Sequence, residues 1–167
     1  MASLILTVVG PDRPGLVRAL SQAVAARGGN WLESRMARLA GQFAGIVMLD
    51  ASEALLDDLP ALESLGLRIV ATISTPAAPA LGPRLMLEVV GNDRPGIVHE
   101  IAQVLAGQGV NIEELTTGVE SGSFSGETLF RARIALHAPN DTAVAAMRDG
   151  LERLGDEFMV DIQPLED

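Results

Sequence analysis

Val-Val-Gly-Pro-Asp-Arg-Pro-Gly-Leu-Val, residues 8–17, occurs a second time as Val-Val-Gly-Asn-Asp-Arg-Pro-Gly-Ile-Val, residues 89–98. The same spacing of 81 positions extends past both copies without a gap. Gln22, Gly28, Asn30 and Glu33 recur as Gln103, Gly109, Asn111 and Glu114. Self-similarity at a fixed period indicates a repeated structural unit, so we interpret the chain as two copies of one unit.

The residues of the first copy predict a strand, a turn and a helix. Leu4 to Val9 is a short apolar run rich in β-branched residues, which is typical of a buried strand. Gly10 is expected to end that strand. Pro14 suits the first position of a helix, where its missing N–H costs nothing. Asp12 lies close enough to cap the helix and to face the positive end of its dipole.

The second copy repeats this pattern with Leu85 to Val90, Gly91, Asp93 and Pro95. In both copies a second glycine, Gly15 or Gly96, leaves the first helical turn without a Cβ, so that a backbone or a small ligand can approach. A strand, a glycine turn and an open helix start are favourable for binding an anion. The alternative interpretation is a strand-to-helix turn that binds nothing.

The composition excludes several classes of protein. The chain has 167 residues, 48% of them hydrophobic and 20% charged, which indicates a globular protein rather than a disordered one. It has no cysteine or tyrosine and only two histidines, His99 and His137, so few residues are available for acid–base catalysis or metal binding.

The charge and the N-terminal residues bear on partners and location. A net charge of −10 argues against direct contact with nucleic acid. The first residues lack the basic region and the long apolar core of a signal peptide, and no apolar run reaches the ~20 residues that span a bilayer. We therefore expect a soluble, cytoplasmic protein without membrane contact.

Each copy is predicted to contain the elements β-α-β-β-α-β, an α+β ferredoxin-like unit with helices on one face of an antiparallel sheet. The predicted domains are residues 1–73 and 84–167, joined by a proline-rich linker, 74–83. Pro60 interrupts the second helix of the first copy, which predicts a kinked or split helix there.

The third strand differs between the copies in a way that concerns the outer face of the sheet. The positions that alternate with the core positions are Ala44, Ile46 and Met48 in the first copy. They are Arg131, Arg133 and Ala135 in the second copy. Because a solvated face is normally polar, the first sheet is expected to be covered on both faces.

Two such units, each beginning with Gly-x-Asp-Arg-Pro-Gly-[Leu/Ile]-Val and followed by Asn-[Trp/Ile], resemble ACT domains. The resemblance covers nearly the whole chain and implies a regulatory module that binds amino acids, usually at interfaces between paired domains. Two ACT-like units alone, with Ser125-Gly126 before Leu129-Phe130, resemble the glycine cleavage system transcriptional repressor family.

The resemblance implies ligand contacts from the loop after the first strand, from the start of the first helix and from the start of the second strand. In the second copy the corresponding residues are Asn92, Asp93, Pro95, Gly96, Ile97, Val98, Asn111 and Ile112. In the first copy they are Asp12, Gly15, Leu16, Val17 and Asn30. Backbone N–H groups near Gly96 would take the carboxylate of the ligand, and Asp93 or Asn111 its ammonium group.

Two departures favour the second copy as the binding copy. Pro11 replaces Asn92 and removes a donor, and the bulky Trp31 replaces Ile112. The expected ligand is glycine or a serine-like amino acid, and no bound cofactor is expected. For the five heavy atoms of glycine, a ceiling of about 1.5 kcal/mol per atom gives roughly −7 kcal/mol, so the Kd is micromolar at best.

Three functions follow as hypotheses. The first is a homodimeric amino-acid-binding regulator that controls transcription in glycine or one-carbon metabolism through a protein partner, a transcription factor. The second is a ligand-free scaffold that mediates oligomerisation. The third is an enzyme, such as a hydrolase that relies on His99 and Asp93, which is the least favoured because His99 has no neighbouring nucleophile beyond Ser and Thr residues in loops. Ser121, Ser123 and Ser125 are interpreted as loop residues.

Overall fold

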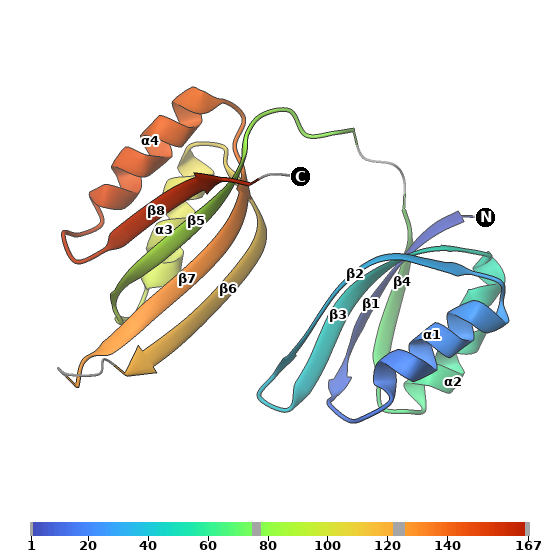
Figure 1. Cartoon of the computed structure of the whole chain (residues 1–167). Helices are drawn as coiled ribbons and strands as arrows, with labels where there is room; N and C mark the ends of the chain where they lie inside the picture. Colours follow the sequence, from blue (N-terminus) through green and yellow to red (C-terminus); the bar gives the residue numbers. More distant parts are fainter. Residues whose placement is uncertain (1, 75–77, 122–125, 166–167) are drawn as a thin grey trace. The chain divides into compact units, whose positions relative to one another are not determined.

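The computed structural model describes residues 2–74, 78–121 and 126–165. It divides into two compact units, Met1–Ala77 and Ala78–Asp167 (Figure 1). Residues 75–77 of the predicted linker and Ser123 and Ser125 lie outside the described residues. None of the helices in the described part of the chain is long and apolar enough to cross a membrane.

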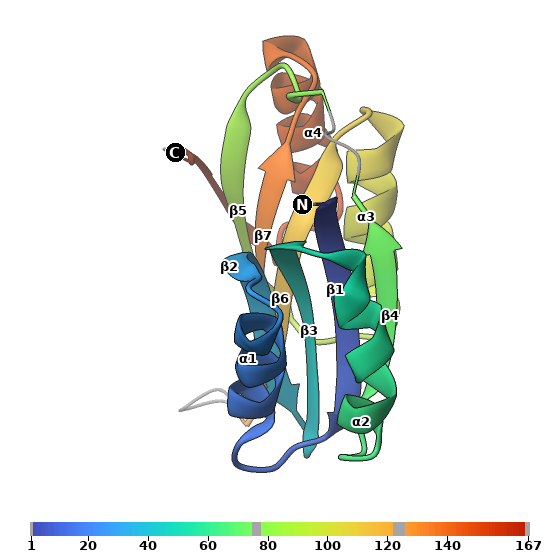
Figure 2. The same ribbon diagram turned by 90° about the vertical axis from the view of Figure 1, so that its right-hand side faces the viewer.

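The first unit contains one antiparallel sheet with the strand order β2-β3-β1-β4. Its elements are β1 (Ala2–Pro11), α1 (Leu16–Ala26), β2 (Asn30–Leu39), β3 (Gln42–Ala51), the 3-10 helix η1 (Glu53–Asp58), α2 (Leu59–Glu63) and β4 (Arg68–Ile73). The split predicted around Pro60 is confirmed, because the 3-10 helix η1 precedes a short α2 that has Pro60 in its first turn. Figure 2 shows α1 and α2 on the same side of this sheet.

The second unit repeats the arrangement with the strand order β6-β7-β5-β8. Its elements are β5 (Arg84–Asn92), α3 (Ile97–Gly107), β6 (Asn111–Ser121), β7 (Thr128–His137), α4 (Asp141–Glu152) and β8 (Met159–Pro164). Asn140 caps α4 by accepting a hydrogen bond from the backbone N–H of Ala143 at 2.9 Å. Both units are therefore ferredoxin-like, as predicted.

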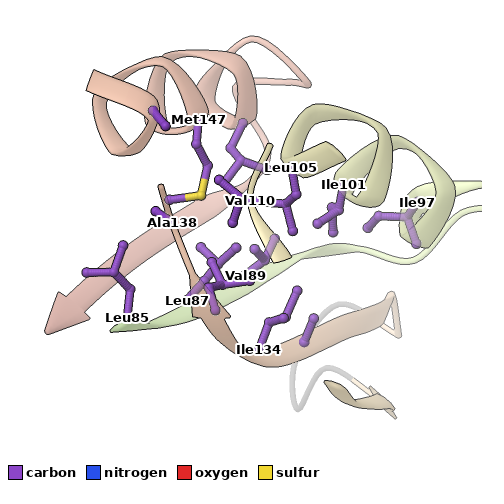
Figure 3. Packing of buried hydrophobic residues seen from close by; sticks show 14 of the residues in the cluster. Leu85, Leu87, Val89, Ile97, Ile101, Leu105, Val110, Ile134, Ala138 and Met147 are labelled. Atoms are coloured by element: carbon purple, nitrogen blue, oxygen red, sulfur yellow. The ribbon is translucent and has the colours of Figure 1, made fainter. Parts of the chain in front are cut away.

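The core of the second unit lies between its sheet and its two helices (Figure 3). Leu87 on β5 and Leu136 on β7 are fully buried, and alternate strand residues point to the same side. Ile101 and Leu105 on α3 and Met147 on α4 point from the helices toward the sheet. Among the described residues of this unit, no helix or strand covers the other face of the sheet.

Candidate functional site

The repeated stretch lies where the first strand of each unit leads into the first helix. The strands do not end at the glycines, contrary to the prediction, because Gly10 still pairs with Phe43 and Gly91 with Phe130. Glycine is needed there for space. A Cβ on Gly10 would lie 2.5 Å from the carbonyl oxygen of Gly66, which is closer than real Cβ contacts.

The helix starts also differ from the prediction. Pro14 and Pro95 lie in turns, and the helices begin two residues later, at Leu16 and Ile97. The residue before each helix, Gly15 or Gly96, has a left-handed φ of 93° or 87°. This conformation, and not a close neighbour, requires glycine there, because an added Cβ would meet nothing within 4 Å.

The predicted caps are absent from both helix starts. No side chain caps α1 or α3. The carboxylate of Asp12 instead forms an ion pair with Arg38 at 2.8 Å. The backbone N–H of Asp93 donates to the carbonyl oxygen of Thr128 at 2.8 Å, and that of Asp12 to Gly41 at 2.9 Å. The N–H groups of the first helical turn, which cannot bond within the helix, therefore have no side-chain acceptor.

An ion pair distinguishes the helix start of the second unit. Arg94 donates two hydrogen bonds to the carboxylate of Glu100, at 2.7 and 2.5 Å, and its guanidinium lies 5.5 Å from the ring centroid of Phe158. These hydrogen bonds hold the pKa of Glu100 below its ordinary value. The first unit has Ala19 at the position of Glu100, so its loop has no equivalent pair.

The Glu100 pair predicts a pH-dependent contribution to stability. Because the folded pKa of Glu100 is lowered, the contribution is complete above the ordinary value of 4.5 and is lost as the pH falls through the lowered value. Glu100→Gln should therefore reduce the urea midpoint at neutral pH and have little effect in acid. Urea unfolding followed by circular dichroism over a pH series measures this, and a pH-independent difference would contradict it.

The side chains of the predicted ligand-binding residues differ in their exposure to solvent. Leu16 and Ile97 are each 4% exposed and belong to the cores, so only their backbones could face a ligand. Val17 and Val98, one position further along the helices, are 46% and 41% exposed. Asp12, Asp93, Gly15, Pro95 and Gly96 are exposed, and Asn92 is half-buried.

Within each unit, the strand register separates the predicted polar residues of the loop after the first strand from the predicted Asn at the start of the second strand. Asn111 pairs with His137, which pairs with Arg84 at the start of β5, whereas Asn92 ends that strand. At about 3.4 Å per residue, these positions are about 27 Å apart. Asn30 and Asp12 are separated in the same way in the first unit. One unit therefore does not bring Asn111 and Asp93 to one small ligand.

A hollow beneath α3 does bring two predicted residues together. Val98 from α3 and Ile112 from β6 both line it. The hollow is partly open to solvent, and the centre of a water-sized sphere can move through about 20 Å³ of it. The repeated sequence motif does not include the other lining residues. They are Ile101, Ala102, Leu115, Thr117, Phe130, Ala132 and Ile134. Its lining is apolar except for Thr117, so it suits an aliphatic group.

The first unit has different residues at the corresponding positions. Where the second unit pairs Thr117 with Ala132, the first pairs Met36 with Gly45. A Cβ on Gly45 would lie 2.5 Å from Cγ of Met36, so the methionine side chain lies directly over the glycine. Trp31, at the position of Ile112, also packs against the core. These larger side chains stand at the positions that line the hollow in the second unit.

Two of the residues considered for catalysis lie on the surface of the second unit. His99 and Ser121 are exposed, on α3 and at the end of β6. Within residues 2–74, 78–121 and 126–165 there is no cluster of three or more His, Cys, Asp or Glu side chains that could hold a metal ion.

Comparison with known proteins places both units in one family. Two models described as ACT domain match residues 2–72 and 85–149. The glycine cleavage system transcriptional repressor of Escherichia coli K12 is 23% identical over 161 residues, which cover 93% of this chain and 85% of that protein.

Several solved structures match over nearly the whole chain. The crystal structure of an unknown protein from Galdieria sulphuraria is 32% identical, with a TM-score of 0.83 and 99% of both chains covered. A structure assigned provisionally to a glycine cleavage system transcriptional repressor is 19% identical, with a TM-score of 0.71 and coverage of 99% of this chain and 98% of that one. The second match concerns the fold alone.

Proposed function

Because the chain belongs to the ACT domain family through both of its units, we propose that it is a cytoplasmic regulatory protein that binds a free amino acid. It would control transcription through a protein partner, in glycine or one-carbon metabolism. The similarity to the E. coli repressor supports this assignment. The two ACT domains together cover most of the chain, which indicates a regulatory rather than a catalytic protein.

The hollow beside the uncapped start of α3 is the observation that carries the proposal. Val98 lies in the first turn of α3, and its side chain lines the hollow. A ligand carboxylate would accept hydrogen bonds from the first-turn N–H groups, where the helix dipole favours negative charge. An aliphatic side chain on the same ligand would then enter the hollow.

The ammonium group of the ligand needs an acceptor outside the hollow. Asp93 is exposed at the same end of the unit and is one candidate. The second candidate acceptor is Asn111 or Asn30. The strand register places each of these residues far from the loop after the first strand of its own unit, so the acceptor would come from a neighbouring ACT unit. β2 and β6 are outer strands of their sheets in the described part of the chain, and an outer strand allows such side-by-side pairing.

The apolar lining predicts which amino acids bind best. Glycine leaves the hollow empty, whereas valine places two methyl groups in it. At about 0.8 kcal/mol for each buried methyl group, valine should bind roughly tenfold more tightly than glycine. Isothermal titration calorimetry of the full chain with glycine, serine, valine and isoleucine measures the order.

The outcomes of the titration separate two claims. Binding of glycine or serine with equal or higher affinity would refute the role of the hollow but retain an amino-acid sensor. No heat with any of the twenty amino acids would refute the sensor itself.

The charge of the chain supports a protein partner over direct DNA contact. The chain has twenty-two acidic residues and only twelve basic ones, and phosphate binding requires clustered Lys and Arg. The regulator would therefore act on transcription by binding a separate DNA-binding protein.

A ligand-free scaffold is the second candidate, and exposed apolar side chains favour it. Ile46 and Val70 on the first sheet are 53% and 64% exposed, as expected for a surface that another protein covers. If the chain is a scaffold, the Gly96→Ala variant should oligomerise like the natural sequence. No amino acid should shift the thermal unfolding midpoint of the natural chain.

A further inference from the structure

The outer faces of the two sheets are chemically different although they occupy equivalent positions. On each sheet the residues that alternate with the core positions point away from the helices. In the first unit this face, which we call the first open face, is mainly apolar. Its central residues are Ile5, Thr7, Val9, Ala44, Ile46, Met48 and Val70.

The register allows a direct comparison across the middle of each sheet. In the first unit Thr7 on β1 lies between Ile46 and Val70. The equivalent row in the second unit is Glu88 between Arg133 and Asp161. There, Arg133 and Glu88 form an ion pair at 3.3 Å, and Arg131 and Glu120 form another at 3.6 Å.

The second unit thus has a solvated outer face, whereas the first open face exposes branched aliphatic side chains. Val9 is 40% exposed, and Ile46 and Val70 are more exposed than that. The prediction that another layer covers the first sheet on this side gains support from this contrast. We propose that the first open face is the contact surface between two copies of this chain, with each copy presenting the same face to the other.

The charge distribution favours a second copy as the occupant. The charged side chains around the first open face are Glu33, Arg35, Asp50 and Arg68, which sum to zero in a chain of net charge −10. Two like faces can therefore approach without the repulsion that other surfaces of this acidic chain would impose. The charged outer face of the second unit is a poor match for aliphatic side chains.

The size of the first open face is sufficient for such a contact. Four strands about 4.8 Å apart, with four outward residues along β1, β2 and β3 and three along β4, about 6.8 Å apart, give roughly 500 Å². Two copies would bury about 1,000 Å² in total, which reaches the area expected of a specific interface. A two-fold contact of this kind is closed, so it gives a dimer and not a filament.

The dimer can be tested with residues taken from the second unit. Ala44→Arg with Ile46→Arg introduces the arginines that β7 carries as Arg131 and Arg133, so the same fold is known to accept them at these positions. Sedimentation velocity of the full chain should show a dimer for the natural sequence. The double variant should be a monomer at the same concentration, with the dissociation constant raised by about a hundredfold or more, because four arginines would be buried together.

Arg133→Gln on the second sheet is the matched control and should remain a dimer. A monomeric natural chain, or a double variant that still dimerises, would overturn the proposal.

If the double variant does not fold, spin labels test whether the first open faces of two copies lie against each other. The chain has no cysteine, so Thr7→Cys carries a single label at the centre of the first open face. Dipolar spectroscopy should detect a short label-to-label distance for Thr7→Cys and a longer one for Glu88→Cys, and the reverse order would overturn the proposal.

Discussion

Thr117→Met combined with Ala132→Gly is expected to abolish most amino-acid binding while the second unit stays folded. These substitutions introduce the cross-strand pair Met36 and Gly45 of the first unit, where the methionine lies over the glycine. The new methionine should fill the hollow and exclude the ligand's aliphatic side chain. Losing two buried methyl contacts and gaining a clash should weaken valine binding by at least ~30-fold. Calorimetric titration with valine measures the loss.

The reverse exchange in the first unit is the control for this variant. Met36→Thr with Gly45→Ala alters the same pair on the other sheet and should leave valine binding at the second unit unchanged. Unaltered valine affinity in the Thr117→Met, Ala132→Gly variant, with native circular dichroism, would show that the ligand does not use the hollow.

Gly10→Ala should be among the most destabilising single substitutions in the first unit. Its Cβ would lie 2.5 Å from the carbonyl oxygen of Gly66 and 3.2 Å from Cδ2 of Leu67. The nearest atom belongs to the backbone, so β1 or the turn before β4 must move. Overpacking of this kind costs about 1–3 kcal/mol, and the cost here should be near the upper end. Chemical unfolding followed by circular dichroism gives the free energy of unfolding.

Gly118→Ala provides the comparison for Gly10→Ala. Gly118 is an exposed strand residue on β6, and an added Cβ would meet nothing within 4 Å. Removing a glycine from a strand should be neutral or stabilise the fold by about 0.5 kcal/mol. Equal effects of the two substitutions would contradict the close approach inferred at Gly10.

The fold class could be predicted from the sequence because its signals are redundant. The strand and helix periodicities appear twice, and each copy supports the interpretation of the other. The start of the helices was less predictable. Pro14 is typical of a first helical position, but the left-handed Gly15 delays the helix to Leu16. A glycine's φ depends on where the chain must go next, and local sequence does not encode that.

The hollow could not be predicted because it depends on a β-bulge. The register of β6 against β7 shifts between Ile112 and Glu114. Strict alternation from Ile112 would point Glu114 toward the core, whereas the bulge turns Leu115 and Thr117 inward. Which side chains line the space under α3 is therefore decided by one extra residue in the strand.

The polar site residues illustrate a different limit of sequence analysis. The motif groups Asp93 and Asn111 as contacts for one ligand, and nothing in their spacing reveals that they lie at opposite ends of the sheet. Only the pairing of β5, β6 and β7 shows the separation of about 27 Å. The apolar outer positions of β3, in contrast, were evident from simple alternation.

Heteronuclear NMR of the isotopically labelled full chain, with amide and methyl chemical shifts followed during titration with valine, tests the proposed site most directly. If the amino acid binds at the start of α3, the amides of Ile97 and Val98 and the methyl groups of Val98, Ile112 and Leu115 should shift together and saturate. Val17, the counterpart of Val98 in the first unit, should not shift. Saturating valine that leaves Val98, Ile112 and Leu115 unmoved, or that shifts Val17 equally, would contradict a binding site in the second unit.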